Sequence, residues 1–418
     1  MSSRSVSFAL SLCLAGASAQ AAQEPDPHET KHYLLHSIDG AVNEEDCAAI
    51  LEQAWPVFQS FFRVEPELKG KARLRIEVFP GRESWLAGPH AGGKPPPADL
   101  ETTWFDRDSR VAYVCRSVSE YETRKRVIYV ACQQFHACSK SKNLDLDTWY
   151  VHGLAESFST HAWDGEKLTL AASPRICIFD HPARAREALG GATIGLDAFD
   201  EKRLDNPSVR WSAVRFAMEG AGGKHRARFD KFALGHRGSK LSGEDFLRSL
   251  GRAENISQEF VAWLDAAQLQ FEVLSGGWED LLDGRVVCRT IAPQVGLACA
   301  RRPVSTLQYS LRQRELNSGC TLGVVLDATS GRDYRIFRLR PPHAMVEQYT
   351  DGELVSTGDL LPFEGYDNEL VAIEATSANG AVTINVDGRV FGPFPVEKPR
   401  LGIAIHDGPI TLQRLQAH

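Results

Sequence analysis

The chain has 418 residues, which is enough for two or three domains with substantial cores. Apolar residues make up 43% of the chain and charged residues 24%, as is typical of a soluble globular protein. The net charge of −7 is mild and no strong basic stripe occurs, which argues against nucleic acid as a partner.

The first 21 residues have the pattern of a secretory signal peptide. Arg4 supplies the positive N-terminal region, residues 6–15 form the apolar run, and two overlapping Ala-x-Ala motifs after it offer cleavage sites. This apolar run is too short to span a bilayer, and no later run approaches the roughly 18 apolar residues that a transmembrane helix needs. We therefore expect an exported protein, periplasmic or extracellular, with no transmembrane segment.

Eight cysteines would remain after removal of this peptide. An even number of cysteines in an oxidising compartment makes disulfides plausible. No CxxC motif occurs, so neither a cysteine zinc site nor a thioredoxin-like site is supported. Odd counts lie on either side of residue 275, which requires a bridge between domains or free thiols: Cys47, Cys115, Cys132, Cys138 and Cys177 before it, and Cys288, Cys299 and Cys320 after it.

Residues 22–274 are predicted to form an α+β domain, because strand-like runs come first and helical patterns follow. An amphipathic helix is expected at 44–62, where Pro56 should kink it or split it in two. The segment 88–97 is rich in glycine and proline and is expected to be a loop. Further strands are expected at 32–37, 72–79 and 111–114, and further helices at 119–138, 145–161, 209–220, 226–235, 243–251 and 257–269.

Residues 275–418 have a different sequence pattern, in which short runs of alternating apolar and polar residues are separated by Asx-Gly pairs. Such pairs favour positive φ angles and are strong signals of β-hairpins. They occur at 283–284, 351–352, 379–380, 387–388 and 407–408. The runs 382–389 and 401–406 resemble strands of concanavalin/laminin-G-type jelly rolls, which implies an all-β sandwich after the first domain.

The stretch from Tyr129 to Ser157 carries the most specific pattern in the chain, YVACQQFHACSKSKNLDLDTWYVHGLAES. In gluzincin-type metallopeptidase domains of secreted bacterial proteins, one helix carries H-E-x-x-H-Q-F and the next reads roughly W-x-x-E-G-L-A-E. Here Gln134-Phe135 and the run Trp149–Glu156 match that pattern. Residues 22–274 thus resemble a gluzincin-type domain, which implies a zincin-like α+β fold with a mixed sheet.

The same resemblance indicates that the zinc chemistry has been lost. It places Tyr129 and Gln133 where two zinc-binding histidines stand, and Val130 where the catalytic glutamate stands. His152 takes the position of the third ligand, while Glu156 is retained. A phenol and an amide are poor zinc ligands, and valine cannot act as a general base. We therefore expect these five vestigial positions to be packing residues, with no catalytic residue, metal or cofactor.

Two other kinds of chemistry stay open in the same stretch. His136, His152 and Glu156 could form a relocated zinc site, which would make the chain an active zinc-dependent hydrolase. Cys132 and His136 lie four residues apart on one helix and could form an activated thiolate pair. A cysteine in the middle of a helix is more often a small buried apolar residue or a disulfide partner.

Other charged residues have simpler interpretations. Asp145 and Asp147 could bind calcium, but Asp147 is better interpreted as the N-cap of the second helix of the motif. Arg184 with Arg186, and the basic run at 224–228, are interpreted as solvated helix faces.

The leading hypothesis is an exported, catalytically degenerate metallopeptidase-like protein that binds an extended peptide, a glycan or a surface. Such a scaffold can add a peptide to a sheet edge, and the sandwich could supply a glycan-binding face. The alternatives are the hydrolase with a relocated metal, a structural module of an envelope complex, and a glycosidase that uses sandwich side chains. The glycosidase candidates are Glu347, Asp351, Glu364 and Tyr366.

Overall fold

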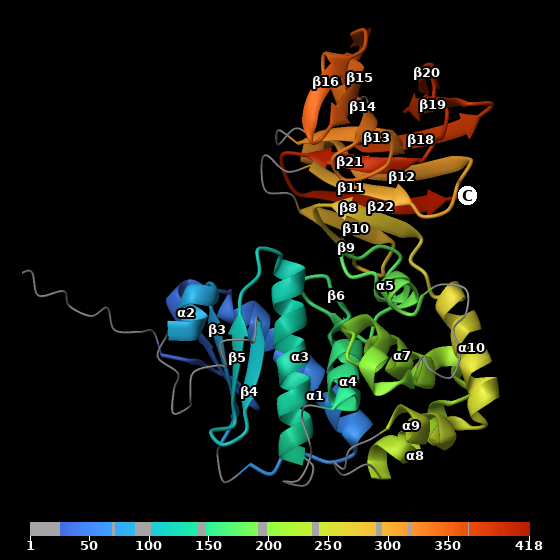
Figure 1. The fold of residues 1–418 in the computed structure, drawn as a ribbon. Helices are drawn as coiled ribbons and strands as arrows, with labels where there is room; N and C mark the ends of the chain where they lie inside the picture. The colour runs from blue at the N-terminus through green and yellow to red at the C-terminus, as the bar shows by residue number, and fades with distance from the viewer. Residues whose placement is uncertain are drawn as a thin grey trace, which may run out of the picture.

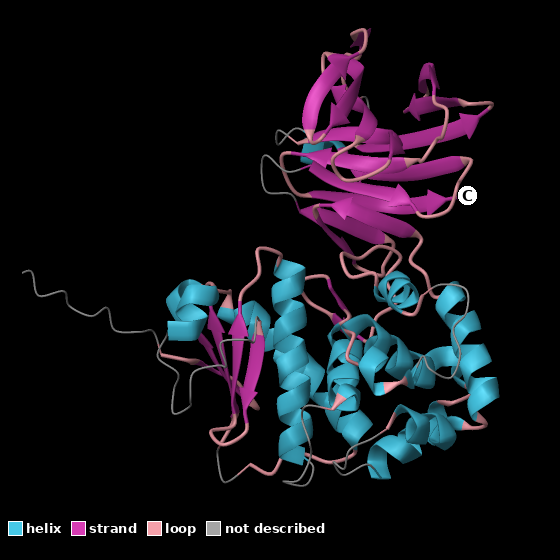
Figure 2. Cartoon of the chain, in the orientation of Figure 1, coloured by secondary structure: helices cyan, strands magenta, loops and turns pink. Residues whose placement is uncertain are grey.

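The chain folds into two bodies, a domain of sheet and helices and a second domain made of β-strands (Figure 1, Figure 2). The expected signal peptide, the expected loop at 88–97, and Asp145 with Asp147 lie outside the described residues. The computed structural model describes residues 26–68, 72–87, 102–139, 148–190, 199–235, 242–289, 295–316, 320–366 and 368–418.

A five-stranded mixed sheet opens the first domain, with the order β1-β2-β3-β5-β4. The central strands β2 (Tyr33–Ser37), β3 (Leu74–Phe79) and β5 (Val111–Cys115) run parallel. At the two edges, β1 (His28–Glu29) and β4 (Thr103–Asp106) pair antiparallel to their neighbours. Strands covered on both faces have continuous apolar runs, and every residue of β5 is buried.

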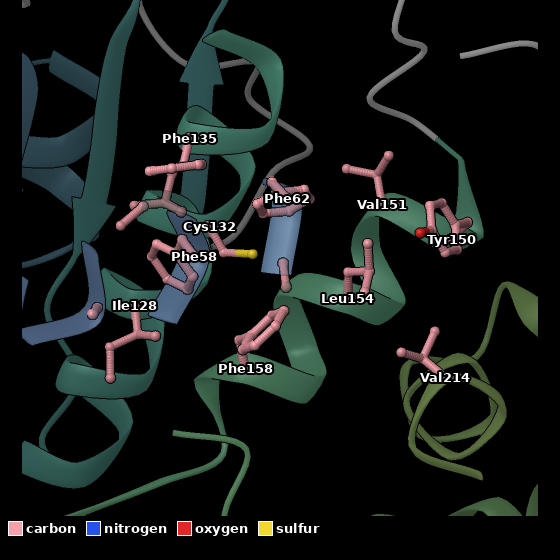
Figure 3. Close-up of a cluster of buried hydrophobic side chains, with 14 of the residues drawn as sticks. Phe58, Phe62, Ile128, Cys132, Phe135, Tyr150, Val151, Leu154, Phe158 and Val214 are labelled. Carbon is pink, nitrogen blue, oxygen red and sulfur yellow. The ribbon is translucent and has the colours of Figure 1, made fainter. Parts of the chain in front are cut away.

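Three helices pack against one another, and the first two also contact the sheet: α1 (Glu44–Phe62), α3 (Glu120–Ser139) and α4 (Trp149–Ser159). Helix α1 has the bounds predicted from its apolar spacing, but it is not split at Pro56. This proline lies on the exposed side of α1, where water can bind the carbonyl group that loses its donor. Figure 3 shows the apolar side chains that meet between these helices, among them Phe58, Phe62, Ile128, Cys132, Phe135, Leu154 and Phe158.

The start of α4 differs from the prediction. The N-cap is Thr148, whose hydroxyl accepts a hydrogen bond from the Val151 amide at 3.4 Å, where the sequence favoured Asp147. The helix ends at Ser159, and His161 already belongs to the short strand β6 (His161–Trp163). A hydroxyl at this position satisfies one of the amides that the first turn of a helix leaves open.

The rest of the first domain is largely helical. The helical patterns after residue 208 correspond to α7 (Pro207–Gly223), α8 (Arg226–Gly235), α9 (Gly243–Leu250) and α10 (Ala253–Ala266). Several short elements were not predicted, because a few residues show no clear period. They are the 3-10 helix η1 (Ile38–Gly40), α2 (Arg82–Ala87), β7 (Leu168–Leu170), α5 (His181–Ala188) and α6 (Glu201–Leu204).

The second domain is a β-sandwich of two antiparallel sheets that share one apolar core. One sheet has the order β20-β19-β18-β12-β22-β10-β9, and the other has the order β16-β15-β14-β13-β21-β11-β8 with β17 paired to β15. The elements are β8 (Phe271–Ser275), β9 (Gly277–Asp280), β10 (Arg285–Arg289), β11 (Val295–Ala300), β12 (Thr306–Arg312), α11 (Gln313–Leu316), β13 (Thr321–Ala328), β14 (Tyr334–Arg340), β15 (His343–Thr350), β16 (Glu353–Thr357), β17 (Leu361–Pro362), β18 (Leu370–Ala378), β19 (Ala381–Val386), β20 (Arg389–Pro395), β21 (Gly402–His406) and β22 (Ile410–Ala417).

Four of the five Asx-Gly pairs stand at hairpin turns, as predicted, whereas Asp407-Gly408 joins β21 of one sheet to β22 of the other. Asp351-Gly352 joins β15 to β16, Asn379-Gly380 joins β18 to β19, and Asp387-Gly388 joins β19 to β20. In these three pairs both residues have positive φ angles, between 50° and 87°. Such a turn matches the right-handed twist of the strands it connects.

Ion pairs with buried carboxylates join the two domains. Arg124 of α3 donates to both carboxylate oxygens of Glu279 on β9, at 2.8 and 2.7 Å, and the Arg175 guanidinium binds Asp280 in a similar way at 2.9 and 3.1 Å. Ile176 inserts into the core of the sandwich. Strand β8 begins at Phe271 and pairs with β11, so the sandwich starts before residue 275, where the sequence placed the boundary.

Within the described ranges, the helices are all too short or too polar to cross a membrane.

Candidate functional site

A cleft of about 900 Å³ opens in the first domain, and residues of the Tyr129–Ser157 motif line part of it. Strand β4 and helix α3 contribute to its walls, together with α4, α5 and the start of α7. Its lining residues are Thr102, Thr103, Glu122, Lys125, Arg126, Tyr129, Glu156, Phe179, His181, Arg184, Glu187, Ala188, Asn206, Pro207, Ser208 and Arg210.

The three residues at the expected zinc-ligand positions meet beside this cleft. The Tyr129 hydroxyl lies 2.5 Å from Nδ1 of His152, and Nε2 of Gln133 lies 3.1 Å from the same nitrogen. Gln133 also donates to the Tyr129 hydroxyl at 3.4 Å. Burial, and then the negative charge of Glu156, raises the pKa of Tyr129 above its ordinary value, so this phenol stays protonated. Hydrogen bonds thus link the three side chains to one another.

The position expected for a general base faces the other way. Val130 is fully buried and belongs to the apolar core of the first domain. Successive residues of a helix point in different directions, so a side chain next to Tyr129 need not share its face.

A second polar chain begins one turn earlier on α3. Lys125 forms an ion pair with Glu156, and Nε2 of His181 lies 3.9 Å from the same carboxylate. Nδ1 of His181 lies 3.2 Å from the Ser208 hydroxyl. Burial alone would raise the pKa of Glu156, but the charge and the hydrogen bond of Lys125 hold that pKa below its ordinary value. Glu156 is thus an ionised carboxylate with its own cationic partner.

The His181 imidazole is neutral in this environment. Burial, and then the charge of Lys125, lowers the pKa of His181 to about 3. Its ring stacks on Trp211 with centroids 4.9 Å apart and on Phe179 with centroids 6.0 Å apart. A base whose conjugate acid has so low a pKa gives little driving force for taking a proton from the Ser208 hydroxyl at neutral pH. We therefore interpret His181 and Ser208 as positioning residues.

The structure does not bring His136 together with His152 and Glu156. The ring of His136 stacks on Phe62 at 4.5 Å and contacts Tyr150 edge-on at 6.4 Å. Helices α3 and α4 run antiparallel, so Lys125 contacts Glu156, whereas His136 lies three turns, roughly 16 Å, further along α3. Over the described ranges, no three His, Cys, Asp or Glu side chains group as a metal site would require.

The thiol of Cys132 is part of the apolar core. Cys132 is 1% exposed, and burial raises the pKa of its thiol above the ordinary value. Nucleophilic thiols need the opposite environment, one that favours the thiolate. In the described part of the chain no two cysteines form a disulfide, so the expected disulfides are not found.

Helix α7 approaches α4 closely at Gly153 of the motif. A Cβ atom there would lie 2.8 Å from the carbonyl oxygen of Arg210 and 2.9 Å from Cγ2 of Val214. The glycine therefore sets how close the Arg210 backbone stands to α4. Arg210 lines the cleft and was not singled out by any sequence pattern.

Arg184 also lines the cleft, although the sequence indicated a solvated helix face. Its guanidinium donates to the Ile178 carbonyl at 3.3 Å and lies 5.8 Å from the centroid of the Phe179 ring. The side chain is exposed, as expected, but it is exposed to the cleft. Its position depends on α5, a helix that the sequence analysis missed.

The sandwich residues considered for a glycosidase do not assemble. Glu347 on β15 is buried, accepts a hydrogen bond from Tyr349 at 2.9 Å and contacts Arg338 at 3.2 Å. Asp351 occupies the β15–β16 turn, and Glu364 lies on a loop after β17. In the described ranges no polar contact joins Glu347 to Asp351, Glu364 or Tyr366.

Comparison with known proteins finds matches among solved structures. No protein-family model and no curated protein matches the chain. The carbohydrate-binding module CBM66 of Bacillus subtilis is 10% identical, with 36% of this chain and 95% of that chain covered and a TM-score of 0.28.

The galectin LEC-6 of Caenorhabditis elegans is 16% identical over 32% of this chain and 96% of its own, with a TM-score of 0.23. A Bacillus licheniformis β-glucanase is 10% identical over 35% and 89%, also with a TM-score of 0.23. The description of the second domain as a β-sandwich rests on its own two sheets and shared core.

Proposed function

We propose that this chain is an exported, catalytically degenerate metallopeptidase-like protein that binds an extended peptide in the cleft between β4, α3, α5 and α7. One observation carries the proposal. The residues in register with the zinc ligands, Tyr129, Gln133 and His152, are hydrogen-bonded to one another. These hydrogen bonds occupy the Tyr129 hydroxyl and Nδ1 of His152 inside the protein, which supports a binding role for the polar walls of the cleft.

Strand β4 supports the peptide as ligand, because it forms an edge of the sheet and contributes Thr103 to the cleft. The Cys115 amide donates to the Thr102 carbonyl at 2.8 Å, which makes Thr103 and Val114 a pair without mutual hydrogen bonds. The amide and carbonyl of Thr103 consequently point away from β5. An extended peptide can add to these groups as a further strand.

Zinc content separates this proposal from the hydrolase with a relocated metal. The purified protein, treated with zinc and dialysed, should hold far less than one zinc per chain by elemental analysis. A stoichiometry near one would overturn the degenerate-site proposal and favour the hydrolase.

Restoring the ligands tests the peptidase-like scaffold itself. The variant Tyr129→His/Gln133→His/His152→Glu should bind close to one zinc per chain, because it recreates three ligands at the spacing of a zinc site. The single variant Gln133→His is the matched control and should stay zinc-free. A triple variant that keeps its circular dichroism spectrum but takes up no zinc would refute the scaffold assignment.

Peptide addition to β4 is tested with fluorescein-labelled octapeptides rich in valine and threonine. Binding to the full mature chain, followed by fluorescence anisotropy, should disappear when alternate amides of the peptide are N-methylated, because these groups can no longer pair with the strand. Equal binding of both forms would contradict strand addition.

Glycan binding by the sandwich is a second candidate function. A hollow of about 1130 Å³ at the loop end of the sandwich contains the stacked rings of Tyr334 and Tyr349, whose centroids are 4.6 Å apart. The ion pair Arg335–Asp327 and the amide of Gln348 also line it. Aromatic faces with a few fixed polar groups are typical of small-molecule sites. A glycan array probed with the wild type and with Tyr349→Ala tests this, and equal signals would reject the site.

A further inference from the structure

Some of the cationic side chains that line the cleft form ion pairs with carboxylates, and others do not. Two cations of α3 have carboxylate partners: Lys125 pairs with Glu156, and Arg126 pairs with Glu122 at 2.7 Å. The cleft has two more cations, Arg184 and Arg210, and one more carboxylate, Glu187. The α5 and α7 wall therefore has a surplus of positive charge.

Among the described residues, the hydrogen bonds that Arg184 and Arg210 donate go to carbonyl oxygens of the main chain. Arg184 donates to the Ile178 carbonyl and Arg210 donates to the Asp205 carbonyl, each at 3.3 Å. Across the described residues, no carboxylate oxygen lies within 4.0 Å of either guanidinium, Glu187 included. Nε of Arg210 is buried and has no hydrogen-bond partner among the described residues.

An unsatisfied buried donor on a charged group is costly unless a ligand supplies the acceptor. A guanidinium has five donors in a planar fork that matches the two oxygens of a carboxylate. Arg210 also stands close to the polar chain of the site, since its charge acts on Tyr129, Glu156 and His181. An anion held by Arg210 would thus lie next to the hydrogen-bonded cluster.

We propose that the cleft binds its peptide through a carboxylate, which Arg184 of α5 and Arg210 of α7 hold on the wall opposite β4. This inference rests on the peptide-binding function proposed above and names the chemistry of the ligand. The carboxylate is either the C-terminus of the peptide or the side chain of an aspartate or glutamate. In both cases the peptide backbone pairs with β4 while its negative charge neutralises the two arginines.

Three matched octapeptides test the inference on the full mature chain. They share one sequence rich in valine and threonine and a fluorescein label. The first has a C-terminal amide, the second a free C-terminal carboxylate, and the third a C-terminal amide with one glutamate placed in turn at each position. We expect the second or the third set to bind about 10- to 100-fold more tightly than the first in fluorescence anisotropy, as a charge-assisted hydrogen bond implies. The tighter set identifies the source of the carboxylate.

The variants Arg184→Gln and Arg210→Gln should each remove most of this preference, measured as the ratio of the affinities for the carboxylate and amide peptides. Lys202→Gln, which replaces an exposed cation on the nearby α6, is the control and should leave the preference intact. Because Arg184 is exposed, its variant stays folded even if Arg210→Gln does not.

The possible failures separate the two proposals. Equal binding of all three peptides would overturn the carboxylate inference and leave peptide binding in place. If the preference survives both arginine variants, the site assignment is wrong. If none of the peptides binds at millimolar concentration, both the inference and the proposed function are refuted.

Discussion

The replacement Glu279→Ala tests how the two domains are joined. Glu279 is 1% exposed and receives three hydrogen bonds, two from Arg124 at 2.8 and 2.7 Å and one from Arg289 at 2.8 Å. The Arg124 side chain is only 7% exposed. Loss of the carboxylate leaves this guanidinium in a low-dielectric interface with its main partner gone.

The magnitude follows from the cost of an uncompensated buried charge. Breaking a buried pair by removing one partner typically costs about 3–5 kcal/mol. Glu120 remains within 3.8 Å of Arg124, but its side chain is 62% exposed and provides little compensation. We therefore expect a loss of about 3 kcal/mol in the free energy of unfolding. Arg124→Met should cost less, because Glu279 keeps Arg289 as a partner.

The assay is a double-mutant cycle followed by urea unfolding. Wild type, Glu279→Ala, Arg124→Met and the double variant are compared, with tryptophan fluorescence reporting near Trp278 and circular dichroism reporting on the whole chain. The double variant should be less destabilised than the sum of the single variants, by about 1.5 kcal/mol or more. If Glu279→Ala costs less than about 1 kcal/mol and the two changes add, the pair does not couple the domains and the reasoning is refuted.

Three further predictions concern the first domain. His161 and His181 have pKa values of about 3 when folded, against about 6.5 when unfolded, so the unfolded chain binds more protons and the free energy of unfolding should fall as the pH decreases from 6.5 toward 3. In that range each histidine changes the free energy of unfolding by about 1.4 kcal/mol per pH unit. Urea titrations at pH 7, 6 and 5 measure this dependence, and in His181→Gln the free energy of unfolding should fall less steeply with pH, by about that amount. The native Cys132 thiol should resist iodoacetamide at neutral pH by mass spectrometry and react only after unfolding, whereas native alkylation would contradict its burial. Gly153→Ala should lower the melting temperature, because the added methyl group would lie 2.8 Å from a carbonyl oxygen of α7, while Gly235→Ala, where nothing lies within 4 Å, should not.

Much of the secondary structure could be predicted because its causes are local. The spacing of Ile50, Leu51 and Phe58 is enough to specify α1, whose bounds agree with the prediction. The pairs at 351–352, 379–380 and 387–388 each fix their own turn through positive φ angles that few other residues adopt readily. Elements such as α5 could not be predicted, because eight residues with half of them polar or charged show no clear period.

The disulfides were expected from an oxidising compartment and an even number of cysteines, and these two features were not sufficient to predict them. An even count suggested disulfides, but the folded chain distributes the cysteines over separate apolar clusters, with Cys132 in the first domain and Cys288 in the sandwich. A disulfide needs Cα atoms within about 7 Å and suitable directions of the side chains. The number of cysteines in a sequence gives neither the distance between their Cα atoms nor the direction of their side chains.

By itself, the sequence determined the change from an α+β pattern to an all-β pattern near residue 275, several hairpin turns and the long helices. Each of these depends on the identity of a residue or on a spacing of a few residues. Only the tertiary structure decided which side chains meet. The antiparallel packing of α3 and α4 brings Tyr129 and Gln133 to His152 and keeps His136 away from Glu156. The packing of α5 and α7 then places Arg184 and Arg210 on one wall of the cleft, because contacts between distant segments depend on how whole helices dock.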